Sequence, residues 1–295
     1  MPLEPNVGAF GNYVVAQQMG YYKEEGLDVA WLGAQGAVDG AKQVVAGNAD
    51  LGSGLGPETA IIARAQGIPI KGISVNGGHP YHSIVSLDTA PIKTPQDLKG
   101  KTVAVVSAVD TSYFVLLATI SAGGLTKDDV NIVPVGPTPA LAQALIQKKA
   151  DAFIGPPPYI AIVQLAGLNP YVMQVGTYFP GFAQGMFTSD ANMKSKADIL
   201  KGFVRASLRG LQLEIDNPDQ ATKLVLQAVP AQSDQEKSIN LGFKLSNDLV
   251  HKDQNPLGSI DPDRVKKLQD YYLQQKLIDK ASAVDDLYTN EFVPK

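Results

Sequence analysis

Apolar residues recur in two alternating patterns along this 295-residue chain. Short runs rich in β-branched residues, such as Thr-Val-Ala-Val-Val at 102–106, are typical of buried strands. Longer apolar or amphipathic stretches, such as 58–66 and 113–122, are typical of helices that pack on a sheet. The alternation of short strands with helices predicts an α/β fold in which mostly parallel sheets carry helices on both faces.

The two patterns assign most of the chain to short elements. We expect strands at 27–32, 49–52, 81–87, 150–155 and 182–188. We expect further helices at 12–19, 39–46, 140–148, 197–216, 220–228, 234–249 and 261–275. Asn12 is a suitable N-cap for the first of these helices, and Asp261 before Pro262 begins the last one.

The order of elements repeats about 100 residues further along the chain. The stretch 25–52 contains a strand, a Gly-rich turn, a helix and a second short strand, and 124–155 follows the same plan. Between the two copies, Thr94 and Pro95 mark a helix start that leads into the buried strand at 102–106. Two halves with one plan predict two similar lobes that face each other.

The segments 81–87 and 182–188 are expected to cross between the lobes and act as a hinge. Chain order then gives a discontinuous lobe I, residues 1–82 plus 187–295, and a lobe II of residues 83–186. The C-terminal helices belong to lobe I in this interpretation, where they serve as scaffold.

Composition narrows the class of function. The net charge is −4 at pH 7 and basic residues do not cluster, which argues against nucleic acid or an anionic membrane as the main partner. The chain has no cysteine, so disulfides, thiolate metal sites and cysteine nucleophiles are excluded. It has no run of about 18 apolar residues that could span a membrane, and residues 1–5 lack the features of a secretory signal. These observations indicate a binder of small molecules or an enzyme.

Four stretches together resemble the solute-binding proteins of ABC importers, in the branch that serves sulfonates, nitrate and thiamine-pyrimidine precursors. They are Gly-Tyr-Tyr-Lys-Glu-Glu-Gly-Leu-Asp-Val at 20–29, Gly-Asn-Ala-Asp at 47–50, Gly-Ile-Pro-Ile-Lys at 67–71, and 92–106. The resemblance implies a type II periplasmic-binding-protein fold whose lobes close around a sulfonate, a pyrimidine-like or an aromatic compound. It also implies a monomer without cofactor, in the periplasm or anchored outside a Gram-positive cell, with an ABC permease of the inner membrane as partner. The resembled family begins with a strand just before residues 3–12, so we expect that the sequence starts inside the protein and lacks its signal and first strand.

Ligands of such sheets bind at the carboxyl ends of the strands, beside helix N-termini. The loops at these ends supply our candidate ligand-binding residues. In lobe I they are Asn12, Gln35, Ser53, Gly54 and Leu55, and in lobe II they are Ser107, Asp110, Thr111, Ser112, Thr138, Pro157 and Tyr159. Four residues near the crossing strands complete the set, namely His79, His82, Tyr178 and Phe182.

Several of these residues have a purely structural alternative. Asp110 or Ser107 could simply cap the helix that follows. The aromatic residues could form walls around a ring or pack the hinge, and the three prolines at 156–158 suggest a rigid apolar loop. His79 and His82 suit a hydrogen bond to ligand or hinge better than a metal site, because His251 lies far along the chain. We therefore expect neither a metal site nor catalytic residues.

The arginines bear on the charge of the ligand. All four, namely Arg64, Arg205, Arg209 and Arg264, fall in predicted helices away from the candidate loops. Unless Arg209 reaches inward, bidentate recognition of a sulfonate or carboxylate is not expected. A neutral, weakly charged or aromatic ligand is favoured instead.

The main alternative to a solute-binding protein is an enzyme on the same scaffold, of the thiamine-pyrimidine or menaquinone-pathway type. The yeast-type pyrimidine synthase uses a cysteine-rich motif and a modified lysine, whereas this chain has no cysteine and its lysines fall at predicted surface or turn positions. A third alternative, the ligand-sensing domain of a regulator, would need a DNA-binding or membrane segment, and this sequence shows neither.

Overall fold

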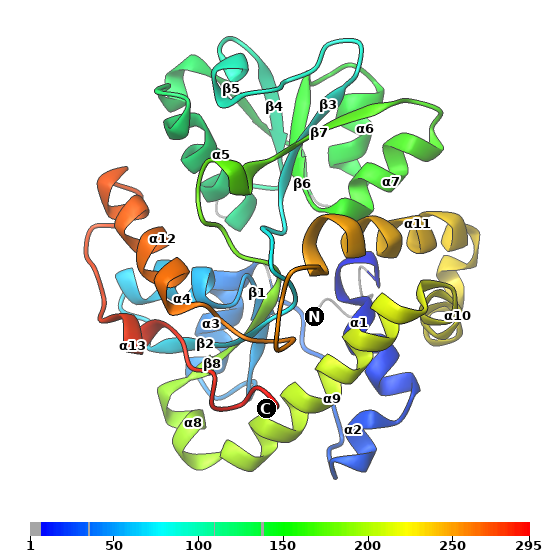
Figure 1. Ribbon diagram of the computed structural model, residues 1–295, viewed down its shortest axis with the longest axis vertical. Helices are drawn as coiled ribbons and strands as arrows, with labels where there is room; N and C mark the ends of the chain where they lie inside the picture. The colour runs from blue at the N-terminus through cyan, green and yellow to red at the C-terminus, as the bar shows by residue number, and fades with distance from the viewer. Residues whose placement is uncertain (1–6, 35, 109, 137–138) are drawn as a thin grey trace.

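The computed structural model describes residues 7–34, 36–108, 110–136 and 139–295. Figure 1 shows two α/β bodies, one above the other, each built around its own sheet. The upper body holds strands β3 to β7 with helices α5 to α7, and the lower body holds β1, β2 and β8 with most other helices. Two segments of the chain cross between the bodies near the centre of the view.

The sheet of the lower body has three strands in the order β1-β8-β2, namely Gly52–Gly54, Gly185–Ser189 and Ile70–Val75. Both ladders are antiparallel because the central strand β8 runs against its two neighbours. The Phe187 ring of β8 packs directly over β1, where a Cβ added to Gly52 would lie 2.5 Å from the ring. Glycine at this position therefore lets the ring cover the strand.

The sheet of the upper body is mixed. Its order is β5-β4-β6-β3-β7, namely Asn131–Pro134, Thr102–Val105, Ala152–Gly155, Ser83–Leu87 and Pro170–Gln174. β4 pairs in parallel with β5 and β6, whereas β3 pairs antiparallel with β6 and β7. The α/β class is as predicted, but neither sheet is mostly parallel, because each contains a strand that has crossed from the other body.

Helices cover both sheets, and most of them match the predicted ranges within a few residues. They are α1 Val7–Gln18, α2 Tyr21–Glu24, α3 Ala37–Val45, α4 Pro57–Ala65, α5 Thr111–Ala122, α6 Ala140–Ile146, α7 Pro157–Leu165, α8 Asp190–Ser195, α9 Ala197–Asp216, α10 Pro218–Ala228, α11 Glu236–Ser246, α12 Pro262–Gln274 and α13 Val284–Leu287. The predicted start at Pro95 is a short 3-10 helix, Pro95–Leu98, with a capping box formed by Thr94 and Asp97. Among the described residues, none of these helices is both long and apolar enough to cross a membrane.

Three local predictions are wrong. Residues 27–32 form no strand; Trp31 instead packs its ring near Tyr13, Tyr22 and Phe203. Asn12 is not an N-cap, because α1 begins at Val7. The proline-rich stretch is not a loop, because Pro157 occupies the first turn of α7, where the missing N–H of proline has no helical partner to lose. The proposed missing first strand stays a prediction, since residues 1–6 lie outside the described ranges.

The predicted crossing strands 81–87 and 182–188 are displaced, because most of each lies within one sheet, as β3 and β8. The chain crosses between the bodies just before these strands, in two segments that lie side by side. The chain passes from β2 to β3 through 76–82 and returns from β7 to β8 through 175–184. The Asn76 N–H donates to the Gln184 carbonyl at 2.6 Å, and the Tyr81 N–H donates to the Phe182 carbonyl at 2.9 Å. These bonds join the two crossings into one narrow connection.

The C-terminal region is more than scaffold for one body. Gly78 N–H donates to the Lys252 carbonyl at 3.1 Å, and His79 N–H donates to the Val250 carbonyl at 3.2 Å. Helix α11 packs against α7 of the upper body, where a Cβ added to Gly242 would lie 3.3 Å from Pro158. The C-terminal helices therefore contact both the crossing segments and the second sheet's helices.

Candidate functional site

Polar side chains from both bodies converge where the chain crosses between the sheets. α1 supplies Asn12 and Tyr13, β1 supplies Ser53, and the first crossing supplies Asn76. The Tyr13 hydroxyl lies 3.1 Å from Ser53 Oγ. Burial raises the pKa of Tyr13, while Ser53, Asn76 and Asn12 beside its hydroxyl act in the opposite direction. The middle of α1, strand β1 and the crossing segment thus meet at one buried hydroxyl.

Four buried polar side chains at this point each carry an atom that has no hydrogen-bond partner among the described residues. We call them the junction cluster: Asn12 (Nδ2), Asn76 (Oδ1), Tyr81 (hydroxyl) and His82 (Nδ1). Their exposed fractions are 3%, 1%, 8% and 8%. Of the described residues, only Ser74 in β2 has another buried polar side-chain atom without a partner. Asn12 and Asn76 lie beside the Tyr13 hydroxyl, and the ring centroids of Tyr81 and His82 are 5.4 Å apart. Because each unpartnered buried atom costs about 1–3 kcal/mol, these four indicate groups that a bound molecule can satisfy.

Burial controls the charge of the titratable groups here. It lowers the pKa of His82 to about 4, and the nearby Asp110 carboxylate opposes this only in part. Burial alone raises the pKa of Glu214, on α9, to about 8, and Glu214 in turn lies close enough to Tyr81 to raise the pKa of that hydroxyl. At pH 7 the histidine is therefore neutral and the glutamic acid is mostly protonated.

The start of α5 brings the upper body to the cluster. Asp110 is the N-cap of α5, and its Oδ1 accepts hydrogen bonds from Ser112 N–H at 2.9 Å and from Ser112 Oγ at 2.5 Å. Asp110 thus takes the structural alternative, the capping of α5, and its predicted role in ligand binding stays a prediction. A Cβ added to Gly36, in the loop before α3, would lie 4.0 Å from Asp110 Oδ2, so loops of the two bodies meet here. Thr111 and Ser112 are buried in the first turn of the helix.

Several candidate residues are engaged elsewhere. His79 Nε2 lies 2.7 Å from the Asp253 carboxylate, and the Tyr178 hydroxyl donates to the Lys93 carbonyl at 3.3 Å. Phe182 is packed in the core, with the Arg264 guanidinium 4.7 Å from its ring centroid. Of the two alternatives for the aromatic residues, Phe182 therefore packs the hinge. The junction cluster therefore does not include these three side chains.

The remaining candidates lie around the cluster or in the core. Leu55 is a core residue whose N–H donates to Thr59 Oγ1 at 3.0 Å, and a Cβ on Gly54 would lie 2.8 Å from Ala37 Cβ. Pro157 and Tyr159 lie in the first turn of α7, and Tyr159 lies close enough to Tyr81 to add to the rise in the pKa of that hydroxyl, which burial mainly causes. Ser107 is half-buried ahead of Asp110. Gln35 and Thr138 lie outside the described residues.

Sequence reasoning missed Tyr13, Asn76, Tyr81 and Glu214. A usable signal existed for Asn76, which ends a run of β2 residues and is followed by Gly77 and Gly78. A Cβ on Gly77 would lie 2.2 Å from the Val250 carbonyl oxygen, so the glycine marks a close backbone approach at the crossing. The role of Glu214 had no such signal, because it lies in an amphipathic helix far along the chain.

All four arginines have hydrogen-bond partners, and those of Arg264 are backbone carbonyls of the two crossing segments. Arg205 pairs with Glu25 through two hydrogen bonds of 2.6 Å, and Arg209 pairs with Glu24 at 2.6 Å while stacking on Tyr21. Arg64 donates to the Ile70 carbonyl and to Asp190, and Arg264 donates to the carbonyls of Gly78 and Gly181. In the described parts of the chain, no lysine or arginine is among the buried residues.

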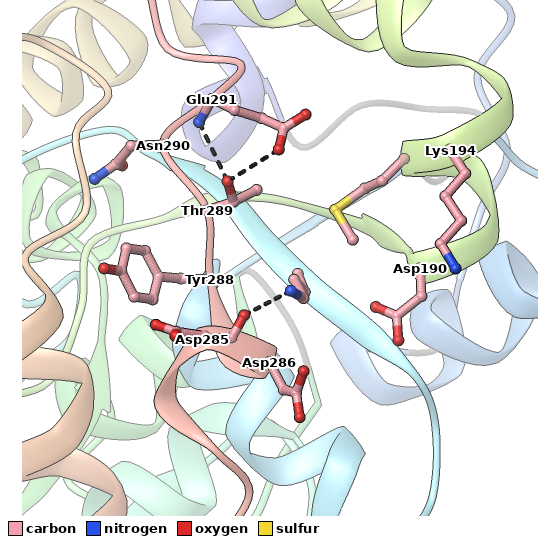
Figure 2. Close-up of a pocket in the computed structure, with 10 residues that line it drawn as sticks. Asp190, Lys194, Asp285, Asp286, Tyr288, Thr289, Asn290 and Glu291 are labelled. Atoms are coloured by element: carbon pink, nitrogen blue, oxygen red, sulfur yellow. Dashed lines mark hydrogen bonds between the residues drawn. The ribbon is translucent and has the colours of Figure 1, made fainter.

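A separate hollow of about 630 Å³ lies on the lower body, between β2, α8 and the C-terminal segment (Figure 2). The side chains of Asp190, Lys194, Asp286 and Glu291 surround it, and Lys71 Nζ donates to the Asp285 carbonyl at 2.5 Å. None of the buried unpartnered atoms identified in the described residues belongs to its lining. Within those residues, no three His, Asp or Glu side chains form a group that could hold a metal ion.

Comparison with known proteins supports a binding fold. The riboflavin-binding protein RibY of Chloroflexus aurantiacus is 29% identical over 98% of this chain and 84% of its own length. A 4-amino-5-hydroxymethyl-2-methylpyrimidine phosphate synthase of Legionella pneumophila is 26% identical over 95% of this chain and 87% of its own. The periplasmic aliphatic sulphonate binding protein SsuA of Escherichia coli superposes with a TM-score of 0.70 at 20% identity, covering 95% of this chain and 88% of its own.

These matches confirm the predicted periplasmic-binding-protein fold and the resemblance to solute-binding proteins. The model of one family, described as NMT1/THI5 like, matches residues 8–221, which is most of the chain. The protein therefore belongs to the NMT1/THI5-like family.

Proposed function

We propose that this protein is the solute-binding component of an ABC import system and captures a small organic molecule at the junction cluster. The observation that carries this proposal is the group of four buried polar atoms without partners at the crossing between the two bodies. Solute-binding relatives such as RibY and the fold of the periplasmic SsuA support it. By the same analogy, the protein acts outside the cytoplasmic membrane, as a monomer, and delivers its ligand to a membrane permease.

Capture works through closure of the two lobes, which we place at residues 1–82 plus 187–295 and 83–186. A ligand shifts the protein toward the closed form only if it binds that form better. Groups from both lobes supply this preference: Ser53 and Tyr13 approach from the lower body, and Thr111 and Ser112 from the upper one. Hinge motion is concentrated in the two crossings because they are the narrow connection between the sheets.

An enzyme is the second candidate, because the Legionella relative is named as a synthase. Two observations favour a binder. The chain has no cysteine. No lysine is among the buried residues in the described ranges, whereas a lysine nucleophile is usually activated by desolvation.

A thermal-shift screen against sulfonates, nitrate, pyrimidines, flavins and aromatic carboxylates tests the proposal, because a ligand of the folded state stabilises it by RT ln(1 + [L]/Kd). We expect a large shift for one class, with the compound recovered unchanged by mass spectrometry. Conversion of the compound would favour the enzyme, and the absence of any shift would contradict capture at this site.

A further inference from the structure

We propose that the ligand is an uncharged molecule that presents a hydrogen-bond donor and an acceptor side by side, as an amide, lactam or imide edge does, and that the junction cluster binds this edge. The inference rests on the proposed function and specifies the chemistry of its ligand.

The unpartnered atoms of the cluster are of both kinds. Asn12 Nδ2 can only donate a hydrogen bond, and Asn76 Oδ1 can only accept one. The Tyr81 hydroxyl and His82 Nδ1 can take either role, the latter according to its tautomer. A sulfonate, nitrate or carboxylate offers acceptors alone, so it would leave the Asn76 oxygen facing a negative charge. A molecule with a donor beside an acceptor can satisfy both asparagines.

The electrostatics lead to the same class. All four arginines are engaged by carboxylates or backbone carbonyls, Arg264 by those of Gly78 and Gly181 in the crossings, and no lysine or arginine is among the buried residues described. His82 stays neutral at pH 7 because burial lowers its pKa to about 4. An anion buried here would lose its hydration without gaining a cation, which is strongly unfavourable. At the start of α5, the N–H of Ser112 already donates a hydrogen bond to the Asp110 carboxylate, so this N–H is not free to bind an anion.

Matched compounds test the ligand class. We would titrate the wild-type protein by calorimetry with uracil and lumichrome as lactam-edge probes, with their N-methylated derivatives, with taurine and naphthalene-2-sulfonate as anions, and with benzylamine as a cation. We expect binding of at least one lactam-edge probe and a loss of at least tenfold in affinity on N-methylation, because methylation removes the donor. Tighter binding of a sulfonate or of the amine would overturn the ligand class and leave capture standing. Silence across all probes would overturn capture and the ligand class together.

A variant pair tests the residues. Asn76→Leu removes an amide whose oxygen has no partner, so we expect the ligand-free protein to melt at a higher temperature while the affinity for the binding probe falls at least tenfold. Asn192→Leu is the matched control, because Asn192 is also buried but donates from Nδ2 to the Asp50 carbonyl at 2.8 Å. The control should melt at a lower temperature and bind with unchanged affinity. Wild-type affinity in Asn76→Leu, or a fall in its melting temperature, would overturn the inference.

Discussion

Two clusters of buried polar groups lie against the same crossing segments, and they differ in whether their polar atoms have hydrogen-bond partners. Around Glu58, every carboxylate oxygen has a donor: Tyr272 donates its hydroxyl to Oε1, and the Phe182 N–H donates to Oε2 at 3.2 Å. Arg264 lies beside it and donates to the Gly78 carbonyl at 2.6 Å. The junction cluster is buried to the same degree, but four of its polar atoms lack partners.

The contrast distinguishes buried polar groups that stabilise the fold from buried polar groups that can bind a ligand. Polar groups that are buried and paired hold the crossing segments in place, and their removal should destabilise the fold. Polar groups that are buried and unpaired reduce stability in the ligand-free protein, so their retention requires another benefit. Ligand binding supplies that benefit at the junction cluster.

The largest effect on stability should come from changing Glu214, the buried acid for which no partner among the described residues offsets burial. Burial alone raises the pKa of Glu214 to about 8, whereas Glu58 has Tyr272, Phe182 and Arg264 to oppose the effect of burial. As pH rises above the ordinary value of 4.5, the unfolded chain releases the Glu214 proton first, so the wild-type protein loses stability until about pH 8. The glutamine of Glu214→Gln does not titrate. Between pH 4 and pH 8.5 the variant's free energy of unfolding should therefore rise by roughly 3–6 kcal/mol relative to that of the wild type, at about 1.4 kcal/mol per unit of pKa difference.

Urea unfolding at a series of pH values measures this difference. Exposed Glu24, changed to Gln, is the control and should give a difference that varies little with pH. A Glu214→Gln difference that stays flat between pH 4 and 8.5 would show that the acid is not held protonated by burial.

Arg264→Met should have the next largest effect. The change removes hydrogen bonds to two carbonyls of the crossing segments and leaves buried Glu58 without its nearby cation. We expect the free energy of unfolding to fall by about 3–5 kcal/mol. Arg205→Met breaks an exposed pair with Glu25 and should cost below about 1 kcal/mol in the same urea titration. Equal losses in the two variants would argue against a structural role for the Glu58 cluster.

A Tyr→Phe substitution in each cluster compares the contribution of one hydroxyl to stability, and we expect smaller effects than those above. Tyr272→Phe removes the donor to Glu58 Oε1 and should cost about 1–3 kcal/mol of unfolding free energy. Tyr81→Phe removes a hydroxyl without a partner, so its stability should match or exceed that of the wild type. Thermal unfolding of both variants at pH 7 measures the pair, and a loss at Tyr81 equal to that at Tyr272 would remove the distinction.

Much of the fold could be predicted from the sequence because local signals agreed with it. The helix start at Thr94 and Pro95 and the β-branched run of β4 identified their elements correctly. Residues 27–32 were misassigned because an apolar run looks the same whether it pairs in a sheet or packs Trp31 among aromatic rings. Tyr81 and Glu214 could not be found from sequence, since their importance depends on burial and on missing partners, which only the tertiary structure sets.

Hydrogen exchange with and without the compound that gives the largest thermal shift tests the central claim most directly. If one ligand is held between the bodies at the junction cluster, binding should slow exchange together at residues 53–55, at 76–82 and in the first turn of α5. Protection in only one body, or only beside the hollow around Lys71, would contradict capture at the junction.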